Sequence, residues 1–306
     1  MMIGLGLDSG GTRCRWRLVD AAGAEIGGGD APAISGHVFT PEEQAGARKN
    51  IAALAALVTG VARPHTIVAG MTGVDAQSAA SLFMRGAFAE AFDITSANVS
   101  VISDVETAYH AAFAPGEGYL VYAGTGSVGC FIEASGHCVV IGGRGAGIDD
   151  AGAAYWIAIQ ALRAVLRLED TGEGAGWRTP MGQRFAEIIG ATDWPGVRSF
   201  VYGQNRGGVG LLALGVAEAA RAGDAAALGI FAEAGRELAR LGRTLIGRFG
   251  PRPVVVTGGA LRLHAGIFTA LEESLRGIAP CRYIEADAAL AAARLALKLG
   301  AASAQA

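Results

Sequence analysis

The chain has 306 residues, 51% of them hydrophobic and 17% charged, and its mean hydropathy is +0.36. This composition excludes a disordered chain, and the length predicts one or two domains with a sizeable core. A formal net charge of −3 offers no basic surface for nucleic acid. No apolar run reaches the roughly 18 residues of a membrane span, and the first residues lack the basic region and cleavage site of a signal peptide. We therefore expect a cytoplasmic protein that binds neither nucleic acid nor membranes.

Two parts of the chain share one pattern of strands and turns. Each predicts a three-stranded antiparallel meander whose first turn is rich in glycine and hydroxyl groups. Gly10 precedes Gly23 by 13 residues, and Gly124 precedes Gly136 by 12 residues. This repeat predicts two related domains that face each other. The strands are expected at 3–8, 13–19 and 24–28 in the first meander, and at 119–123, 128–133 and 137–141 in the second.

Helices and strands alternate outside the meanders, as expected when crossover helices cover a mixed sheet. Capping boxes at Thr40–Glu43 and Ser103–Glu106 mark two helix starts. The segment 169–208 is broken by Gly, Pro and Trp, so the sequence leaves its structure open. The first helix should turn Ile51, Leu54, Val58 and Val61 inward. Helices are expected at 41–63, 77–92, 104–113, 152–168, 209–222, 225–249, 264–276 and 286–299, and strands at 66–71, 99–102, 253–257 and 282–284.

The glycine-rich turns are the first candidate binding elements. Backbone N–H groups in such turns can converge on an anion because no Cβ blocks the approach of phosphate oxygens. The turns at 8–12 and 124–127 have this composition, and two facing copies could clamp the β- and γ-phosphates of one nucleotide. A single copy is more often only a turn, and neither is a Walker A loop or a GxGxxG motif. A third element is the strand that ends in the turn Gly258-Gly259. A base or ribose could lie against the backbone of this turn, or the turn could simply connect the strand to the next helix.

Carboxylates beside these turns are the candidate catalytic groups. Asp8 ends a strand next to the first turn and could orient Mg²⁺ through water. Asp104 begins a helix, whose N-terminal dipole favours the carboxylate that would accept a hydrogen bond from a substrate hydroxyl. It could equally be an ordinary helix-start aspartate. Asp149 and Asp150 follow the glycine-rich loop 142–147, which could enclose a small polar ligand; adjacent acids are also often solvated or cap a helix.

Several of these motifs occur together in one known family. They are Asp8-x-Gly-Gly-Thr12, Ser103-Asp104, Gly124-Thr125-Gly126-Ser127, Gly142-Gly143 to Asp150-x-Gly152, Ala154-Tyr155-Trp156 and Thr257-Gly258-Gly259. In order and spacing the chain resembles the N-acetylglucosamine kinases of the BadF/BadG-type ATPase family, within the sugar kinase, actin and heat-shock chaperone superfamily. The resemblance covers essentially the whole chain.

The resemblance implies an α/β fold of two ribonuclease-H-like (actin-like ATPase) domains, each a mixed five-stranded sheet with flanking helices, with a cleft between them. The domains would span 1–115 and 116–285, with a helix at about 286–306 returning to the first. The implied cofactors are ATP and Mg²⁺, and we expect a homodimer. By resemblance, Asp104 would be the catalytic base and Asp8 would assist Mg²⁺. The phosphates would contact Gly10, Gly11, Thr12, Gly124, Thr125, Gly126 and Ser127, and the adenosine would lie near Gly258 and Gly259. The sugar would contact Thr72, Asp104, Thr125, Arg144 and Asp150.

Departures from the family pattern leave the substrate open. The family commonly has an asparagine in the loop after the first meander, where this chain reads Ala31-Pro32-Ala33-Ile34. A second family asparagine is replaced here by Val128, and the usual tryptophan of the Gly-Gly loop is replaced by Arg144. Gly143-Arg144 and Ser127-x-Gly129 look more like bacterial glucosamine kinases. The expected reaction is therefore ATP-dependent phosphorylation of the 6-hydroxyl of N-acetylglucosamine or glucosamine. The alternatives are the ATPase activator of a 2-hydroxyacyl-CoA dehydratase and a non-catalytic sugar sensor. Such an activator needs cysteines that hold an iron–sulfur cluster, and Cys130 and Cys138 of this chain do not match that arrangement.

Overall fold

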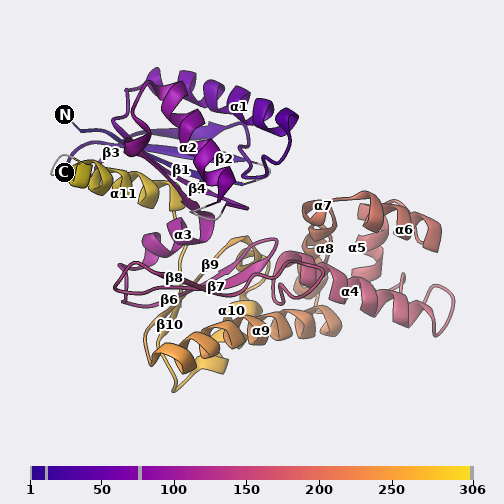
Figure 1. Cartoon of the computed structure of the whole chain (residues 1–306). Helices are drawn as coiled ribbons and strands as arrows, with labels where there is room; N and C mark the ends of the chain where they lie inside the picture. Colours follow the sequence, from indigo (N-terminus) through magenta and orange to yellow (C-terminus); the bar gives the residue numbers. More distant parts are fainter. Residues whose placement is uncertain (1, 11–12, 75–77, 304–306) are drawn as a thin grey trace. The chain divides into compact units, whose positions relative to one another are not determined.

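The computed structural model describes residues 2–10, 13–74 and 78–303. The chain divides into two compact units (Figure 1): unit 1 comprises Met1–Ala114 and Ala286–Ala306, and unit 2 comprises Pro115–Glu285. Each unit contains a mixed five-stranded sheet with flanking helices, which confirms the predicted α/β class. In the part of the chain that the structure describes, no helix is both long and apolar enough to cross a membrane.

The sheet of unit 1 has the strand order β3-β2-β1-β4-β5. Its first three strands form the expected antiparallel meander, while β4 and β5 run parallel to β1. Because parallel strands end at the same edge, the residues that follow β1, β4 and β5 lie close together. The strands are β1 (Gly4–Ser9), β2 (Cys14–Val19), β3 (Glu25–Ala31), β4 (Thr66–Met71) and β5 (Val99–Ser103).

Helices cover both faces of this sheet, and the alternation along β1 decides what each face receives. Leu5 and Leu7 pack into the core that α1 (Pro41–Thr59) and α2 (Ala79–Phe92) close. Gly4 and Gly6 point to the opposite face, where α11 (Ala288–Ser303) lies so close that a Cβ on Gly6 would be 2.0 Å from Ala293 N. Asp8 continues this second row. The remaining helices of the unit are η1 (Ser96–Asn98) and α3 (Asp104–Ala112).

Both predicted capping boxes are confirmed, at Thr40 before α1 and at Ser103 before α3. The inward face predicted for the first helix is correct except at Val61, which is 53% exposed. The helix ends at Thr59, so Val61 lies beyond the last turn and no longer follows the helical period.

The sheet of unit 2 has the order β10-β9-β6-β7-β8, which repeats that of unit 1 when β6 to β10 are matched with β1 to β5. The second meander is antiparallel as expected, and β9 and β10 run parallel to β6. The elements are β6 (Tyr119–Ala123), β7 (Ser127–Ile132), β8 (Cys138–Gly142), β9 (Val254–Thr257), β10 (Cys281–Tyr283), η2 (Gly259–Arg262), α9 (Ala225–Phe249) and α10 (Ala265–Leu275).

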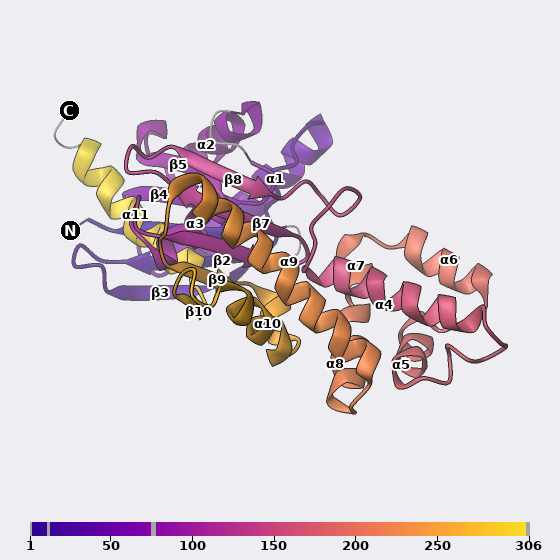
Figure 2. The same cartoon turned by 90° about the horizontal axis from the view of Figure 1, so that it is seen from below.

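Five further helices of unit 2 group together beside α9 (Figure 2). Three of them begin within 169–208, the segment whose structure the sequence left open: α5, α6 and α7 start at side-chain caps on Thr179, Asp193 and Asn205. The single helix expected at 209–222 is interrupted at Leu211. The five are α4 (Ala154–Glu169), α5 (Pro180–Ile189), α6 (Trp194–Gly203), α7 (Arg206–Gly210) and α8 (Leu212–Arg221).

Candidate functional site

The sheet register of unit 1 brings three predicted site elements to one edge. Ser9 pairs with Met71, and Met71 pairs with Ser103. Thr72 and Asp104 therefore follow at the edge where the first glycine turn begins. Thr72 also donates its backbone N–H to the Ser9 carbonyl at 3.0 Å. The turn and the candidate base are thus held by the sheet itself.

Asp104 is the first residue of α3 and is held at both carboxylate oxygens. The Thr72 hydroxyl donates to Oδ2 at 2.6 Å, and the Val105 backbone N–H donates to Oδ1 at 2.9 Å. A distance of 2.6 Å lies in the range of charge-assisted O–H···O⁻ bonds. The carboxylate therefore has a defined orientation. The start of α3 also packs closely on β4 at Gly70, where a Cβ would lie 2.3 Å from the Thr107 hydroxyl. That hydroxyl donates a hydrogen bond to the Asp104 backbone carbonyl at 2.8 Å.

Asp8 stands in an unfavourable environment for a bare negative charge. Burial raises the pKa of its carboxyl above the ordinary value, and the charge of Asp104 raises it further. Arg15, its direct cross-strand partner in the β1–β2 register, opposes that shift. Asp287, which caps α11 and pairs with Arg17 at 3.0 Å, adds a third negative charge that the sequence analysis missed. An Asp before an alanine-rich helix is a helix-start signal that could have located Asp287.

This environment fits the Mg²⁺ ion that an ATP-binding protein of this fold would require. A cation near Asp8 would relieve the repulsion from Asp104, and Mg²⁺ prefers carboxylate oxygen ligands. Among the described residues, no group of three or more His, Cys, Asp or Glu side chains could hold a metal. Mg²⁺ usually keeps several waters and binds through one or two carboxylates together with substrate phosphates.

In unit 2 the loop between β6 and β7 is a tight turn. Gly124 donates its N–H to the Gly126 carbonyl at 2.9 Å, and Ser127 is buried with its hydroxyl on the Ala151 carbonyl at 2.8 Å. In the described part of the chain, no protein group accepts the backbone N–H groups of Thr125 and Gly126. Two consecutive free N–H groups can bind an anion such as a phosphate oxygen.

Asp150 lies directly beneath this loop and is only 4% exposed. A Cβ on Gly126 would be 2.6 Å from Asp150 Oδ2, so the loop requires glycine at that position. Asp150 Oδ1 accepts the Gly145 N–H at 3.2 Å, and Oδ2 lies 3.9 Å from the Arg206 guanidinium. Burial raises the pKa of this carboxyl, and both partners partly offset the shift. Asp150 does not cap α4, because the cap position is Ala153.

The third glycine element lies beside the loop at 124–127. The parallel register places Tyr122 opposite Thr257, so the residues after β6 and β9 are neighbours. Gly258 has a φ of 117°, and a Cβ there would be 2.2 Å from the Ala123 carbonyl oxygen. Only glycine allows this close approach of the two backbones. Gly259 is exposed at the start of η2.

The structure does not bring Gly11, Thr12 or Arg144 into contact with the other candidate site residues. Gly11 and Thr12 lie outside the residues that the structure describes. Arg144 is exposed, and within the described chain its side chain makes no ion pair or hydrogen bond. Arg206, by contrast, was not anticipated, because it belongs to the segment without a periodic pattern.

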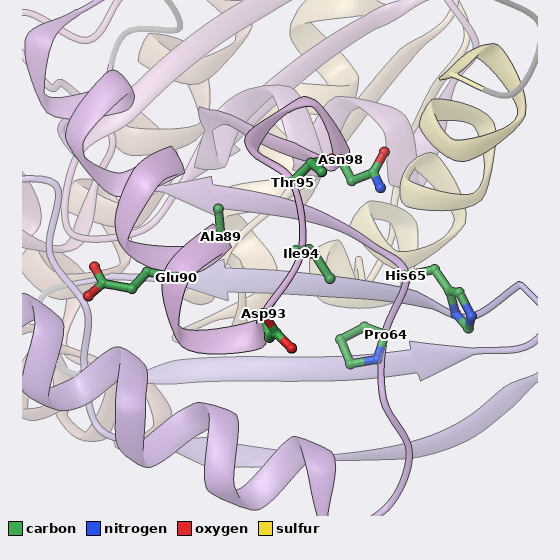
Figure 3. Close-up of a pocket in the computed structure, with 8 residues that line it drawn as sticks. All are labelled: Pro64, His65, Ala89, Glu90, Asp93, Ile94, Thr95 and Asn98. Carbon is green, nitrogen blue, oxygen red and sulfur yellow. The ribbon is translucent and has the colours of Figure 1, made fainter.

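A hollow of about 760 Å³ in unit 1 lies away from these residues (Figure 3). Glu90 and His65 line its opposite ends, and Asn98 lies before β5. His65 precedes β4, so the hollow is at the end of that strand opposite Thr72. It is therefore separate from the edge that holds Asp8, Thr72 and Asp104.

Comparisons with solved structures establish the fold. The chain is similar to a proposed N-acetylglucosamine kinase from Chromobacterium violaceum, with 23% identity, 98% of this chain and 99% of that chain covered, and a TM-score of 0.75. A second proposed N-acetylglucosamine kinase, from Porphyromonas gingivalis, is 15% identical over 97% and 99% of the two chains, with a TM-score of 0.73. A ROK family glucokinase from Streptomyces griseus, solved with glucose and AMPPNP, is 17% identical over 97% and 99%, with a TM-score of 0.61.

No curated protein matches the chain significantly. Family membership is nevertheless clear, because the match spans residues 5–296 and so includes both sheets, both glycine turns and most of α11. The chain belongs to the BadF/BadG/BcrA/BcrD ATPase family.

Proposed function

We propose that this protein is an ATP-dependent sugar kinase that phosphorylates the 6-hydroxyl of an amino sugar, N-acetylglucosamine or glucosamine. The observation that carries the proposal is the carboxylate of Asp104, oriented by Thr72 and Val105 at the strand edge that also holds Asp8. Phosphoryl transfer needs a phosphate cradle, a metal and a group that accepts the nucleophile's proton, and little covalent chemistry from the protein.

Asp104 is suited to accept the proton of the sugar hydroxyl. Its two oxygens receive one hydrogen bond each from Thr72 and Val105, which leaves lone pairs for a substrate O–H. In the proposed step the sugar oxygen forms a bond to the γ-phosphorus, the bond from that phosphorus to the β,γ-bridging oxygen breaks, and the proton passes to Asp104. The products are the sugar 6-phosphate and ADP.

The phosphate groups would be held by backbone and metal rather than by lysine. The free N–H groups of Thr125 and Gly126 would bind phosphate oxygens, and Gly258 and Gly259 would lie near the adenosine. Asp8 would hold Mg²⁺ through water. When bound, Mg²⁺ supplies neutralisation of the charge on the β- and γ-phosphates.

The two alternatives from the sequence have weaker support. A dehydratase activator would use cysteines to hold an iron–sulfur cluster. Cys130 and Cys138 lie on adjacent strands with their Sγ atoms 3.6 Å apart. Within the described chain, neither cysteine belongs to a group of three or more His, Cys, Asp or Glu side chains that could hold a metal. A sugar sensor would bind sugar without turning over ATP, so none of the sugars would stimulate ADP release.

The test is ADP release measured with glucosamine, N-acetylglucosamine, N-acetylmannosamine and glucose, with the product identified by phosphorus NMR. Asp104→Asn should reduce turnover by about 100-fold or more, since general base catalysis contributes about 10² to 10⁴. Asp93→Asn is the matched control, because Asp93 is an exposed carboxylate with a φ of 55°, a conformation that asparagine tolerates. If no sugar stimulates ATP turnover, the kinase is refuted; if Asp104→Asn matches the wild type, the base is wrong.

A further inference from the structure

Two cysteine side chains meet across the hairpin of β7 and β8. In the antiparallel register, Cys130 pairs with Val140 and Cys138 pairs with Ile132. Because side chains alternate along a strand, the two cysteines lie on the same face of the sheet as diagonal neighbours. Their Sγ atoms are 3.6 Å apart. The hairpin therefore holds two thiols in contact, although eight positions separate them in the chain.

The two thiols differ in their access to solvent. Cys130 is 0% exposed, whereas Cys138 is partly exposed. Cys138 also directly follows the turn 134–137, whose four residues are all exposed, so a dissolved reagent can reach it. In thiol–disulfide exchange an accessible thiol reacts first, and a second thiol within reach then displaces the reagent. Cys138 is thus placed to react first and Cys130 to react second.

We propose that Cys130 and Cys138 form a reversible disulfide, which makes this hairpin a site of oxidation by a low-molecular-weight disulfide. The Cys138 thiolate attacks one sulfur of the reagent, breaks its S–S bond and releases one reagent thiol. The Cys130 thiolate then attacks the Cys138 sulfur of the mixed disulfide and releases the second reagent thiol. Two protein thiols are oxidised, the reagent is reduced to two thiols, and the two cysteine protons pass to those thiols. This chemistry is independent of the proposed kinase activity.

The position of β8 allows the bond to form. The two sulfur atoms must approach by about 1.5 Å to reach the bonding distance of about 2.05 Å. Diagonal Cα atoms on adjacent strands are about 7–8 Å apart, slightly more than the roughly 4.4–6.8 Å that disulfides usually span. One strand must therefore shift, and β8 is free to do so because it is the last strand in the sheet order. A disulfide that requires such a shift is of the strained kind that is readily reduced again.

The other two cysteines are poorly suited to this reaction. Burial raises the pKa of the Cys14 thiol to about 11 and that of the Cys281 thiol to about 12. The thiolate is the reactive form, and at pH 8 about one in a thousand or fewer of these thiols is ionised. Cys14 belongs to unit 1, and the strand of Cys281, β10, lies at the opposite end of the sheet from β8. Oxidation should therefore be selective for the hairpin.

The test is oxidation of the reduced full chain at pH 8 with oxidised glutathione, followed by acid quenching, denaturation and alkylation with N-ethylmaleimide. The intact mass then counts the thiols. The wild type should fall from four alkylated cysteines to two, carry no glutathione, and return to four with dithiothreitol. Glu133 lies between the two cysteines, so proteolysis after Glu133 should give two peptides that stay linked until they are reduced.

Two variants separate this pair from the other thiols. Cys138→Ser and the matched control Cys281→Ser each remove a partly exposed thiol from an edge strand, which spares the buried Cys130. Cys138→Ser should form no intramolecular disulfide, whereas Cys281→Ser should fall from three alkylated cysteines to one. The proposal is overturned by a wild type that keeps four thiols or stops at a glutathione adduct, by a link to Cys14 or Cys281, by a disulfide within Cys138→Ser, or by a Cys281→Ser variant that keeps its three thiols.

Discussion

The Gly126→Ala substitution tests the link between the phosphate loop and the residue beneath it. A Cβ at this position would lie 2.6 Å from Asp150 Oδ2, where an ordinary contact begins at 3.4 Å. Asp150 is 4% exposed, and its other oxygen holds the Gly145 N–H, so the carboxylate has little room to retreat. The loop backbone must move instead, by up to about 0.8 Å.

A shift of that size matters more for function than for stability. Overpacking typically costs about 1–3 kcal/mol, while replacing glycine by alanine returns about 0.4–1 kcal/mol through the unfolded chain. A misplacement of about 1 Å in a catalytic site can cost about 100-fold in rate. We therefore expect kcat/KM for ATP to fall by about 10- to 100-fold, with a net loss of stability of about 1–2 kcal/mol.

The assay is ADP release at saturating sugar over a range of ATP concentrations. Gly147→Ala is the matched control, because a Cβ there meets nothing within 4 Å and its φ is not positive. A double-mutant cycle with Asp150→Gly, which removes the clashing oxygen, should shrink the effect of Gly126→Ala on ATP. Wild-type kinetics for Gly126→Ala, or strictly additive effects in the cycle, would refute the reasoning.

Two further predictions concern unit 1. Thr72→Val removes the 2.6 Å hydrogen bond to Asp104. Hydrogen bonds to charged groups contribute about 1.5–3 kcal/mol, so kcat should fall by about 10- to 100-fold while the KM for ATP stays unchanged. An unchanged kcat would contradict the role of Thr72 in positioning Asp104. Asp8→Asn should lower kinase activity by about 100-fold or more but stabilise the protein without Mg²⁺ and ATP. Burial and Asp104 raise the pKa of Asp8 above 3.8, so the folded state binds its proton more tightly than the unfolded state and loses stability as pH rises through that range. Thermal unfolding midpoints measured from pH 4 to pH 7 test this. The midpoint of the wild type should gain less, or fall more, than that of the variant as the pH rises, and the opposite order would refute the reasoning.

Local signals accounted for much of the fold. The strands at 66–71 and 119–123 and the helix at 225–249 were predicted with the bounds that the structure has. The capping box at Ser103 located the start of α3, and with it Asp104. These elements were predictable because their patterns arise from residues within a few positions of one another.

The segment 169–208 was not predicted, although its helix caps at Thr179 and Asp193 were present in the sequence. Short helices with frequent glycine give too few periodic positions to be distinguished from loops. Arg206 was missed for the same reason, since its position 3.9 Å from Asp150 depends on how this segment packs.

By itself, the sequence determined the α/β class, the duplicated meander, and the glycine turns and helix starts that carry most candidate site residues, because these follow from periodicity and from the steric freedom of glycine. Only the tertiary structure decided which of those residues touch. The parallel register placed Thr72 against Asp104, and long-range packing placed Asp150 under Gly126 and beside Arg206. Burial and the charges brought in from distant segments set the pKa values of Asp8 and Asp150, and no local pattern in the chain encodes either quantity.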